Sequence, residues 1–402
     1  MQLDGFLEKK NSLKKIISGT SLIAGTTIGA GMLGIPLITS EMGFFPALCV
    51  TVIVWIFMLL TGLLYLEVAL SLPKGTNIFT MSSHYLGTPG KVASGAMFLF
   101  LYYCLIIAYI AGGAPLLGFL LKNALGIELN QSLVFIIFGL LFGGIVWLGA
   151  KVIDKVNFIL SVAMIAAYFM LVSTGSSEIV IEKLASAKWS KFCLALPVLF
   201  SAFGYHNIVP SLCTYLDRDR KSLKLSIVYG TGIALIVFLV WQWLILGSLS
   251  QGAIQKTMAD GQPVTAALQT LTGKNSLFAI GQGFAFFALV TSFLGVTFSV
   301  VDFLNDGLKF QGKNRLLLVA LTFLPPAFFA FFNPKIFDTA LGVAGGFGEA
   351  FLNGLLPVIL AWKYQALEKE GVHSPILNRK VLSLLFAFAF FVMGLETFLL
   401  LK

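Results

Sequence analysis

Long apolar stretches recur along this chain from one end to the other, separated by short polar segments. A helix of about 20 apolar residues crosses a hydrocarbon core of about 30 Å, and eleven stretches reach that length. We predict membrane spans at residues 15–39, 43–72, 91–121, 132–150, 154–174, 192–216, 224–249, 277–305, 315–333, 337–362 and 380–401. The pattern therefore predicts an all-α integral membrane protein.

The composition agrees with a membrane environment. Of the 402 residues, 58% are hydrophobic and 11% are charged, whereas soluble domains have roughly 45–50% and about 25%. We expect residues 1–14 to form a cytoplasmic N-terminal tail that is retained, because the first span is long and lacks a small-residue cleavage site.

Residues that carry enzyme chemistry are few and scattered. The four cysteines lie in apolar spans without CxxC spacing, and the three histidines have no paired spacing that would suit a metal. We therefore expect no metal, no cofactor and no enzymatic activity.

The lysines and arginines predict the orientation, because basic residues in short loops stay on the cytoplasmic side. With the N-terminus inside, 19 of the 27 basic residues fall on the cytoplasmic face. The odd number of spans then places the C-terminus in the periplasm. This asymmetry accounts for the net charge of +9, so the charge indicates a lipid bilayer as partner and no nucleic acid.

The first span contains a stretch that is unusual for a membrane helix. Residues 25–36 read GTTIGAGMLGIP, with four glycines and one proline. Such residues free backbone groups that lipid cannot satisfy, so a broken helix survives only where protein buries it or where it lines a cavity. Close packing through small residues is the alternative interpretation.

A second interrupted stretch lies in the sixth span, where residues 200–211 read FSAFGYHNIVPS. Spans 1 and 6 are where a repeat of five plus five helices places its two discontinuous helices, and an odd number of helices per repeat requires the halves to be inverted. We predict a first repeat over 15–174, a second, inverted repeat over 192–362, and an extra helix at 380–401. The paired breaks favour a binding site in mid-membrane.

Broken helices suit a free amino acid. Half-helix N-termini stabilise an anionic group, and unwound carbonyls accept an ammonium or another cation. The glycines at 29 and 31 leave the backbone accessible, while Tyr102, Phe203 and Tyr205 are candidates to face an apolar side chain.

Four stretches carry a family resemblance: SGTSLIAGTTIGAGMLGIPLITSEMGFFPA, LLYLEVALSLPKGTN, FGYHNIVPSL and SFLGVTFSVVDFLNDGLK. The chain resembles the hydroxy and aromatic amino acid permease family over most of its length, and within that family the tyrosine-specific transporters. The resemblance implies a LeuT-type fold of the amino acid, polyamine and organocation superfamily, with eleven spans and proton-coupled uptake of an aromatic amino acid. The substrate contacts that it implies are Thr26, Gly29, Ala30, Gly31, Met32, Phe203, Gly204, Tyr205, His206 and Asn207.

Ionisable residues within spans cost about 2.5–3.5 kcal/mol each at the bilayer centre and are therefore candidates for ion coupling. Glu67, His206 and Glu349 are the candidates we retain. His206 lies at the break itself, and its side chain titrates near physiological pH. Each of the three also has a structural alternative, in which the side chain only satisfies neighbouring backbone or packing.

Sodium is the rival coupling ion. The hydroxyls of Thr291 and Ser292 stand where sodium-coupled transporters of the same fold bind sodium, together with carbonyls from about Gly25 to Ile28. Some proton-coupled relatives in the superfamily replace that sodium with a lysine in the fifth span, but this chain has Ser161 about there. The departure weighs against coupling through such a lysine.

We therefore predict a secondary active transporter of a bacterial inner membrane that imports an aromatic amino acid, tyrosine first, by proton symport. The alternatives are sodium coupling, tryptophan selectivity, or a sensor that binds an amino acid without moving it. The short predicted tails disfavour a sensor, which needs a further domain to report occupancy.

Overall fold

The computed structural model describes residues 2–271, 275–308, 314–367 and 375–402. Within these residues ten helices are long and apolar enough to cross a membrane, and a bent helix pair makes an eleventh span. All eleven predicted spans coincide with these segments, so the all-helical membrane class is confirmed. The five-plus-five inverted repeat and the LeuT-type fold stay predictions. Among the basic residues used for the orientation, Lys309, Lys313 and Lys369 lie outside the described residues.

The α-helices are α1 (Gln2–Thr27), α2 (Ile35–Thr39), α3 (Phe44–Ser71), α4 (Ile78–Leu125), α5 (Gln131–Leu148), α6 (Ala150–Gly175), α7 (Ile181–Leu184), α8 (Leu196–Ala202), α9 (Val209–Tyr215), α10 (Arg220–Ser248), α11 (Gln251–Ala259), α12 (Asn275–Leu308), α13 (Arg315–Phe332), α14 (Phe337–Val343), α15 (Leu356–Leu367) and α16 (Arg379–Leu401). The 3₁₀ segments are η1 (Ala30–Leu33), η2 (Ser176–Glu178), η3 (Trp189–Ala195), η4 (His206–Ile208), η5 (Val264–Thr270) and η7 (Pro375–Leu377), and η6 (Ala344–Leu355) is a π-helix.

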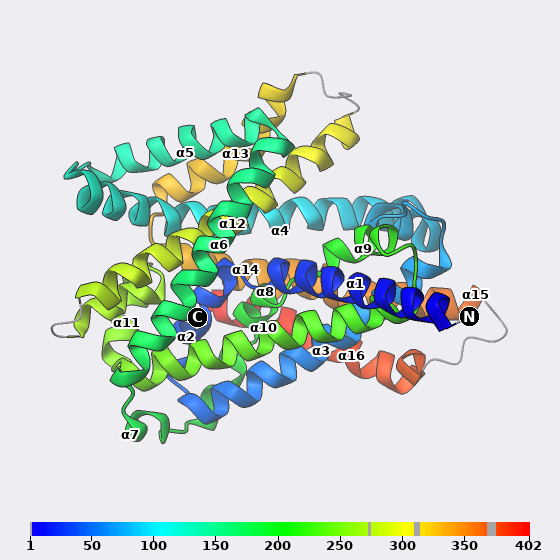
Figure 1. Ribbon diagram of the computed structural model, residues 1–402, viewed down its shortest axis with the longest axis horizontal. Helices are drawn as coiled ribbons and strands as arrows, with labels where there is room; N and C mark the ends of the chain where they lie inside the picture. The colour runs from blue at the N-terminus through cyan, green and yellow to red at the C-terminus, as the bar shows by residue number, and fades with distance from the viewer. Residues whose placement is uncertain (1, 272–274, 309–313, 368–374) are drawn as a thin grey trace.

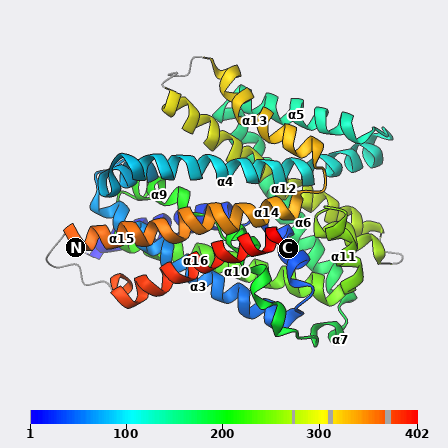
Figure 2. The same cartoon turned by 180° about the vertical axis from the view of Figure 1, so that it is seen from behind.

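Most of the long helices run side by side along one axis, whereas α6 crosses them (Figure 1). The start of α1, the short helix α9 and the end of α15 lie at one end of the molecule, whereas α7 and α11 lie at the opposite end. The view from behind shows the same division and places α5 and α13 together on one flank (Figure 2). Figure 1 also places the N-terminus and the C-terminus on opposite sides of the molecule, as an odd number of spans requires.

The first span is broken between α1 and η1, and the two halves meet at an angle of 47°. Gly29 takes an extended conformation at the break, with φ −161° and ψ −153°. Pro36 then follows near the start of α2. Because proline has no N–H, the Met32 carbonyl lacks the donor that residue 36 would supply in a regular helix. The indole N–H of buried Trp241 donates to that carbonyl instead, at 3.0 Å.

The sixth span is broken between α8 and α9. Regular hydrogen bonding ends where the Phe203 N–H donates to the Leu199 carbonyl, and resumes where the Ile208 N–H donates to Tyr205. Pro210 lies in the first turn of α9, where its missing N–H costs nothing. Both predicted helix breaks are therefore present in the described structure.

The third span begins earlier than its apolar stretch indicates, at Ile78 instead of 91. The Asn77 side chain accepts from the N–H groups of Phe79 and Thr80, and this capping box starts the helix in a polar region. A left-handed Gly87, with φ 69°, then bends the helix before it enters the apolar stretch.

The tenth span contains the π-helix η6 between α14 and α15. Glycine lets this segment approach α8 closely, because a Cβ on Gly345 would lie 2.8 Å from the Ser201 nitrogen. π-Turns are rare and are found frequently at functional sites, which directs attention to the acid that this segment carries, Glu349.

Replacing Trp241 with phenylalanine removes the donor to the Met32 carbonyl. A buried unsatisfied carbonyl costs about 1–3 kcal/mol, so we expect Trp241→Phe to lower the thermal denaturation midpoint of the purified protein in detergent. Trp147→Phe is the matched control, since that side chain is 51% exposed on α5. Equal midpoints for the two variants would show that the Trp241 contact is dispensable.

Candidate functional site

A cavity of about 600 Å³ lies between the two broken spans. Its walls come from the α1 break, the α8–η4 break and helices α4, α6, α12 and η6. This volume falls within the 300–1,000 Å³ that small-molecule sites occupy. The paired breaks and the cavity are therefore one feature of the molecule.

The cavity opens at one end and is closed at the other. At the open end its lining includes exposed residues of the loop between α3 and α4, such as Gly75 and Asn77, and of α9, such as Ser211 and Thr214. At the closed end the backbones of η1 and α8 touch, because a Cβ on Gly31 would lie 2.7 Å from the Ala202 Cα.

The structure brings most of the predicted first-span contacts to the cavity. Thr26, Gly29, Ala30 and Gly31 line it, whereas Met32 does not and is fully buried. The Ala30 N–H donates to the Ser292 hydroxyl at 3.0 Å. The N–H groups of Gly29 and Gly31 have no acceptor among the described residues. Two backbone donors are thus available beside the cavity.

The predicted sixth-span contacts divide between two faces. Gly204 and Asn207 line the cavity. Phe203, Tyr205 and His206 lie outside its lining and are buried.

These three rings are held by neighbouring helices. Phe203 packs on Phe238 of α10 with ring centroids 4.9 Å apart. The Tyr205 hydroxyl donates to the Met58 carbonyl of α3 at 3.1 Å. His206 Nε2 lies 2.9 Å from the Thr61 hydroxyl, also on α3.

Polar side chains gather around a buried carboxyl group in the cavity wall. Glu349 of η6 lines the cavity, and its carboxylate accepts a hydrogen bond from the Asn353 amide. It faces the α8–η4 break, since a Cβ on Gly204 would lie 2.8 Å from the Glu349 Cδ. Tyr102 and Tyr109 of α4 line the same cavity. No lysine or arginine pairs with Glu349 among the described residues.

The hydroxyls considered for sodium also face this cavity. Gly25, Ile28, Thr291 and Ser292 all belong to its lining. The Thr291 hydroxyl donates to the Phe287 carbonyl of its own helix at 2.9 Å, and the Ser292 hydroxyl accepts from Ala30. A lone pair of each oxygen therefore stays available toward the cavity.

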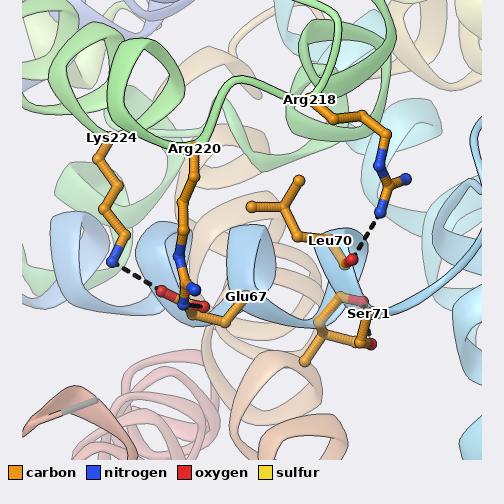
Figure 3. Close-up of polar contacts among 7 residues, drawn as sticks. Glu67, Leu70, Ser71, Arg218, Arg220 and Lys224 are labelled. Atoms are coloured by element: carbon orange, nitrogen blue, oxygen red, sulfur yellow. Dashed lines mark hydrogen bonds and ion pairs between the residues drawn. The ribbon is translucent and has the colours of Figure 1, made fainter. Parts of the chain in front are cut away.

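Glu67, the remaining acid among the ion-coupling candidates, lies elsewhere. It is absent from the cavity lining and forms ion pairs with Arg220 and Lys224 at the start of α10 (Figure 3). Two cations thus compensate its charge, in contrast to Glu349.

Several polar lining residues were missed at the level of sequence: Tyr109, Asn157, Ser201 and Asn353. Ser161, singled out only because it stands where some relatives have a lysine, also lines the cavity. Helical spacing could have found two of them, because Tyr109 follows Tyr102 by seven residues and Asn353 follows Glu349 by four. The side-chain amide oxygen of Asn157 and the Ser201 hydroxyl are buried without a hydrogen-bond partner among the described residues.

Comparison with known proteins agrees with these features. A family model described as the tryptophan/tyrosine permease family matches residues 12–396. Tyrosine-specific transport system 1 of Haemophilus influenzae is 34% identical, over 87% of this chain and 88% of that protein. A tryptophan-specific transport protein of Pseudomonas aeruginosa is 31% identical, over 86% of this chain and 85% of that protein.

A further relative, tyrosine-specific transport system 2 of Haemophilus influenzae, is 33% identical over 87% of this chain and 88% of that protein. All three names describe transport, in agreement with the prediction of a non-enzymatic transporter. The family resemblance carried by the four motifs is thereby confirmed, and this chain belongs to the tryptophan/tyrosine permease family.

Proposed function

We propose that this protein is a secondary active transporter that imports an aromatic amino acid, tyrosine first, across a bacterial inner membrane by proton symport. The observation that carries the proposal is a single cavity lined by both helix breaks in a chain of this permease family. Its volume of about 600 Å³ accommodates one amino acid together with water.

The two ends of a zwitterion have different partners in the cavity wall. The unpaired N–H groups of Gly29 and Gly31 suit a carboxylate, because backbone donors at a helix break attract anions. The Glu349 carboxyl group faces the opposite break at Gly204 and suits a cation. The aromatic side chain then occupies the part of the cavity lined by Phe79, Phe98 and Leu101.

Glu349 is our choice for the proton-carrying group. A carboxylate buried without a paired cation is costly, so a proton or the substrate's ammonium is stabilised beside it. Asn353 donates to this carboxyl group and fixes its orientation. The neutral, protonated acid is also the form that crosses an apolar environment at least cost.

The side to which the cavity opens suggests which stage of transport this conformation represents. The open end carries the α3–α4 loop and α9, and the basic residues assign that loop and the linker after α9 to the cytoplasm. On that assignment the cavity faces inward, and the contact between Gly31 and Ala202 closes the periplasmic path. Alternating access then requires this contact to open.

Sodium coupling is the second candidate, favoured by one observation. The hydroxyls of Thr291 and Ser292 share a cavity wall with Gly25 and Ile28, and oxygen ligands of this kind suit a hard cation. We rank the proton first because the chain resembles transporters that are described as proton-coupled.

The proposal is tested by uptake of labelled tyrosine into proteoliposomes of the purified protein. We expect accumulation with an imposed proton gradient and none with an imposed sodium gradient. Accumulation with sodium alone would move the coupling site to Thr291 and Ser292. Unlabelled tryptophan and phenylalanine serve as competitors, and stronger competition by tryptophan would reverse the substrate preference. Tyrosine binding without uptake under either gradient would identify a sensor.

Gly31→Leu tests the close contact of η1 with α8. A side chain there would strike the Ala202 backbone, and overpacking of this kind costs about 1–3 kcal/mol. We expect uptake to fall on the order of tenfold or more. Gly232→Leu is the matched control, because a Cβ at that glycine of α10 meets nothing within 4 Å. Wild-type uptake by a correctly inserted Gly31→Leu variant would remove this region from the transport path.

Glu349→Gln tests the coupling role and leaves the hydrogen bond from Asn353 possible. We expect the variant to exchange labelled tyrosine across the membrane while losing accumulation under a proton gradient, because the amide carries no proton. Glu396→Gln is the control, since that buried acid of α16 lies outside the cavity lining. Undiminished proton-driven accumulation in Glu349→Gln would exclude Glu349 as the carrier.

A further inference from the structure

Glu67 is a buried residue of α3, and two basic side chains of α10 form ion pairs with it. Its side chain is 2% exposed, while those of Arg220 and Lys224 are 53% and 37% exposed. The Lys224 nitrogen lies 2.8 Å from Glu67 Oε1, and Arg220 binds Oε2. Figure 3 shows both cationic side chains reaching from α10 to this one carboxylate. The contact joins residues that are 153 positions apart in the chain.

The linker between α9 and α10, residues 216–219, is tied to the same end of α3. The Arg218 guanidinium donates to the Leu70 carbonyl at 2.5 Å, as Figure 3 shows. That carbonyl belongs to the last turn of α3, where no intrahelical donor is available and a cation is favoured. Asp217 pairs with Lys15 of α1 at 3.1 Å and lies 3.9 Å from Lys74.

The backbone of the linker also adopts an unusual conformation. Asp217 and Arg218 are both left-handed, with φ of 51° and 60°, a conformation that costs energy in residues other than glycine. Asp219 then caps α10 by accepting from Lys221 and Ser222. The hydrogen bond from the Ser222 hydroxyl lowers the pKa of Asp219 below its ordinary value, so this cap stays ionised at neutral pH.

The pairing of α3 with α10 continues along their length. The Gln242 amide donates to the Thr51 hydroxyl at 3.0 Å, and the Trp55 indole donates to the Thr231 hydroxyl at 3.2 Å. Polar contacts therefore join these two helices at three levels, and Glu67 supplies the one nearest the linker.

The linker continues directly from α9, which lines the open end of the cavity through Ser211 and Thr214. Because the linker is covalently continuous with α9, we expect a displacement of the linker to be transmitted to α9. We propose that Glu67 is a positioning residue: by pairing with Arg220 and Lys224 it fixes the linker on α3 and holds α9 at the mouth of the cavity, and it carries no coupling proton. This inference depends on the proposed transport function only where its tests measure a rate of tyrosine uptake.

The first test uses charge exchange between the paired positions. In Glu67→Lys three cations face one another, and we expect tyrosine uptake to fall by about tenfold or more, as misplacement of a positioning element does. Adding Lys224→Glu restores an opposite-charge pair and the total charge of the wild type, and uptake should recover. Adding Lys221→Glu instead is the matched control, because the Lys221 side chain is exposed on the same helix. The proposal would be overturned if Lys224→Glu and Lys221→Glu restored uptake equally, or if neither change restored it.

Glu67→Gln separates positioning from proton carriage. We expect a slower initial rate and an unchanged steady-state ratio of tyrosine inside to outside under the same proton gradient. Exchange that persists while this ratio falls to unity would make Glu67 a proton carrier and overturn the proposal. A wild-type initial rate in this variant would overturn it too.

A readout independent of transport keeps the inference distinct from the proposed function. The substitution Thr214→Cys, in a chain whose four native cysteines are replaced, reports the position of α9. The readout is the rate at which a membrane-impermeant thiol reagent modifies the purified protein. We expect Glu67→Lys to change this rate and the exchange with Lys224→Glu to restore it. Absence of tyrosine uptake in the wild type would refute the proposed function alone, whereas a constant modification rate would refute the positioning role.

Discussion

Every break in a membrane helix leaves backbone groups that lipid cannot satisfy, and the structure follows from how the protein satisfies them. The Met32 carbonyl loses its helical donor to Pro36 and receives the indole of Trp241. The Ala30 N–H finds the Ser292 hydroxyl. The first break is therefore satisfied from α10 and α12, and the N–H groups that stay unpaired among the described residues, at Gly29 and Gly31, border the cavity.

The sequence predicted the breaks well because glycine and proline act on the backbone at their own positions. It says less about where the side chains around the second break point. Phe203, Tyr205 and His206 were expected at the substrate and are instead held by α3 and α10. Regular helices repeat every 3.6 residues, so a face can be assigned from spacing. An irregular stretch has no such period, and its neighbours decide where each side chain points.

The buried acids show a second limit of sequence reasoning. Glu67 and Glu349 both lie in apolar stretches, and nothing local distinguishes them. The partners of Glu67 are supplied by α10, far along the chain. Among the described residues, the side-chain hydrogen bond of Glu349 comes from an amide four residues away on its own helix. Only the three-dimensional arrangement separates an acid with paired cations from one without them.

The π-helix that carries Glu349 constrains how this transporter can change over evolution. A π-turn holds one residue more than an α-turn, and each residue of an α-helix rotates the following chain by about 100°. Deleting or inserting one residue within 344–355 would change this rotation, and it would turn either Glu349 or the whole of α15 away from its present neighbours. Selection therefore acts on the length of this segment as well as on its packed glycines, such as Gly345.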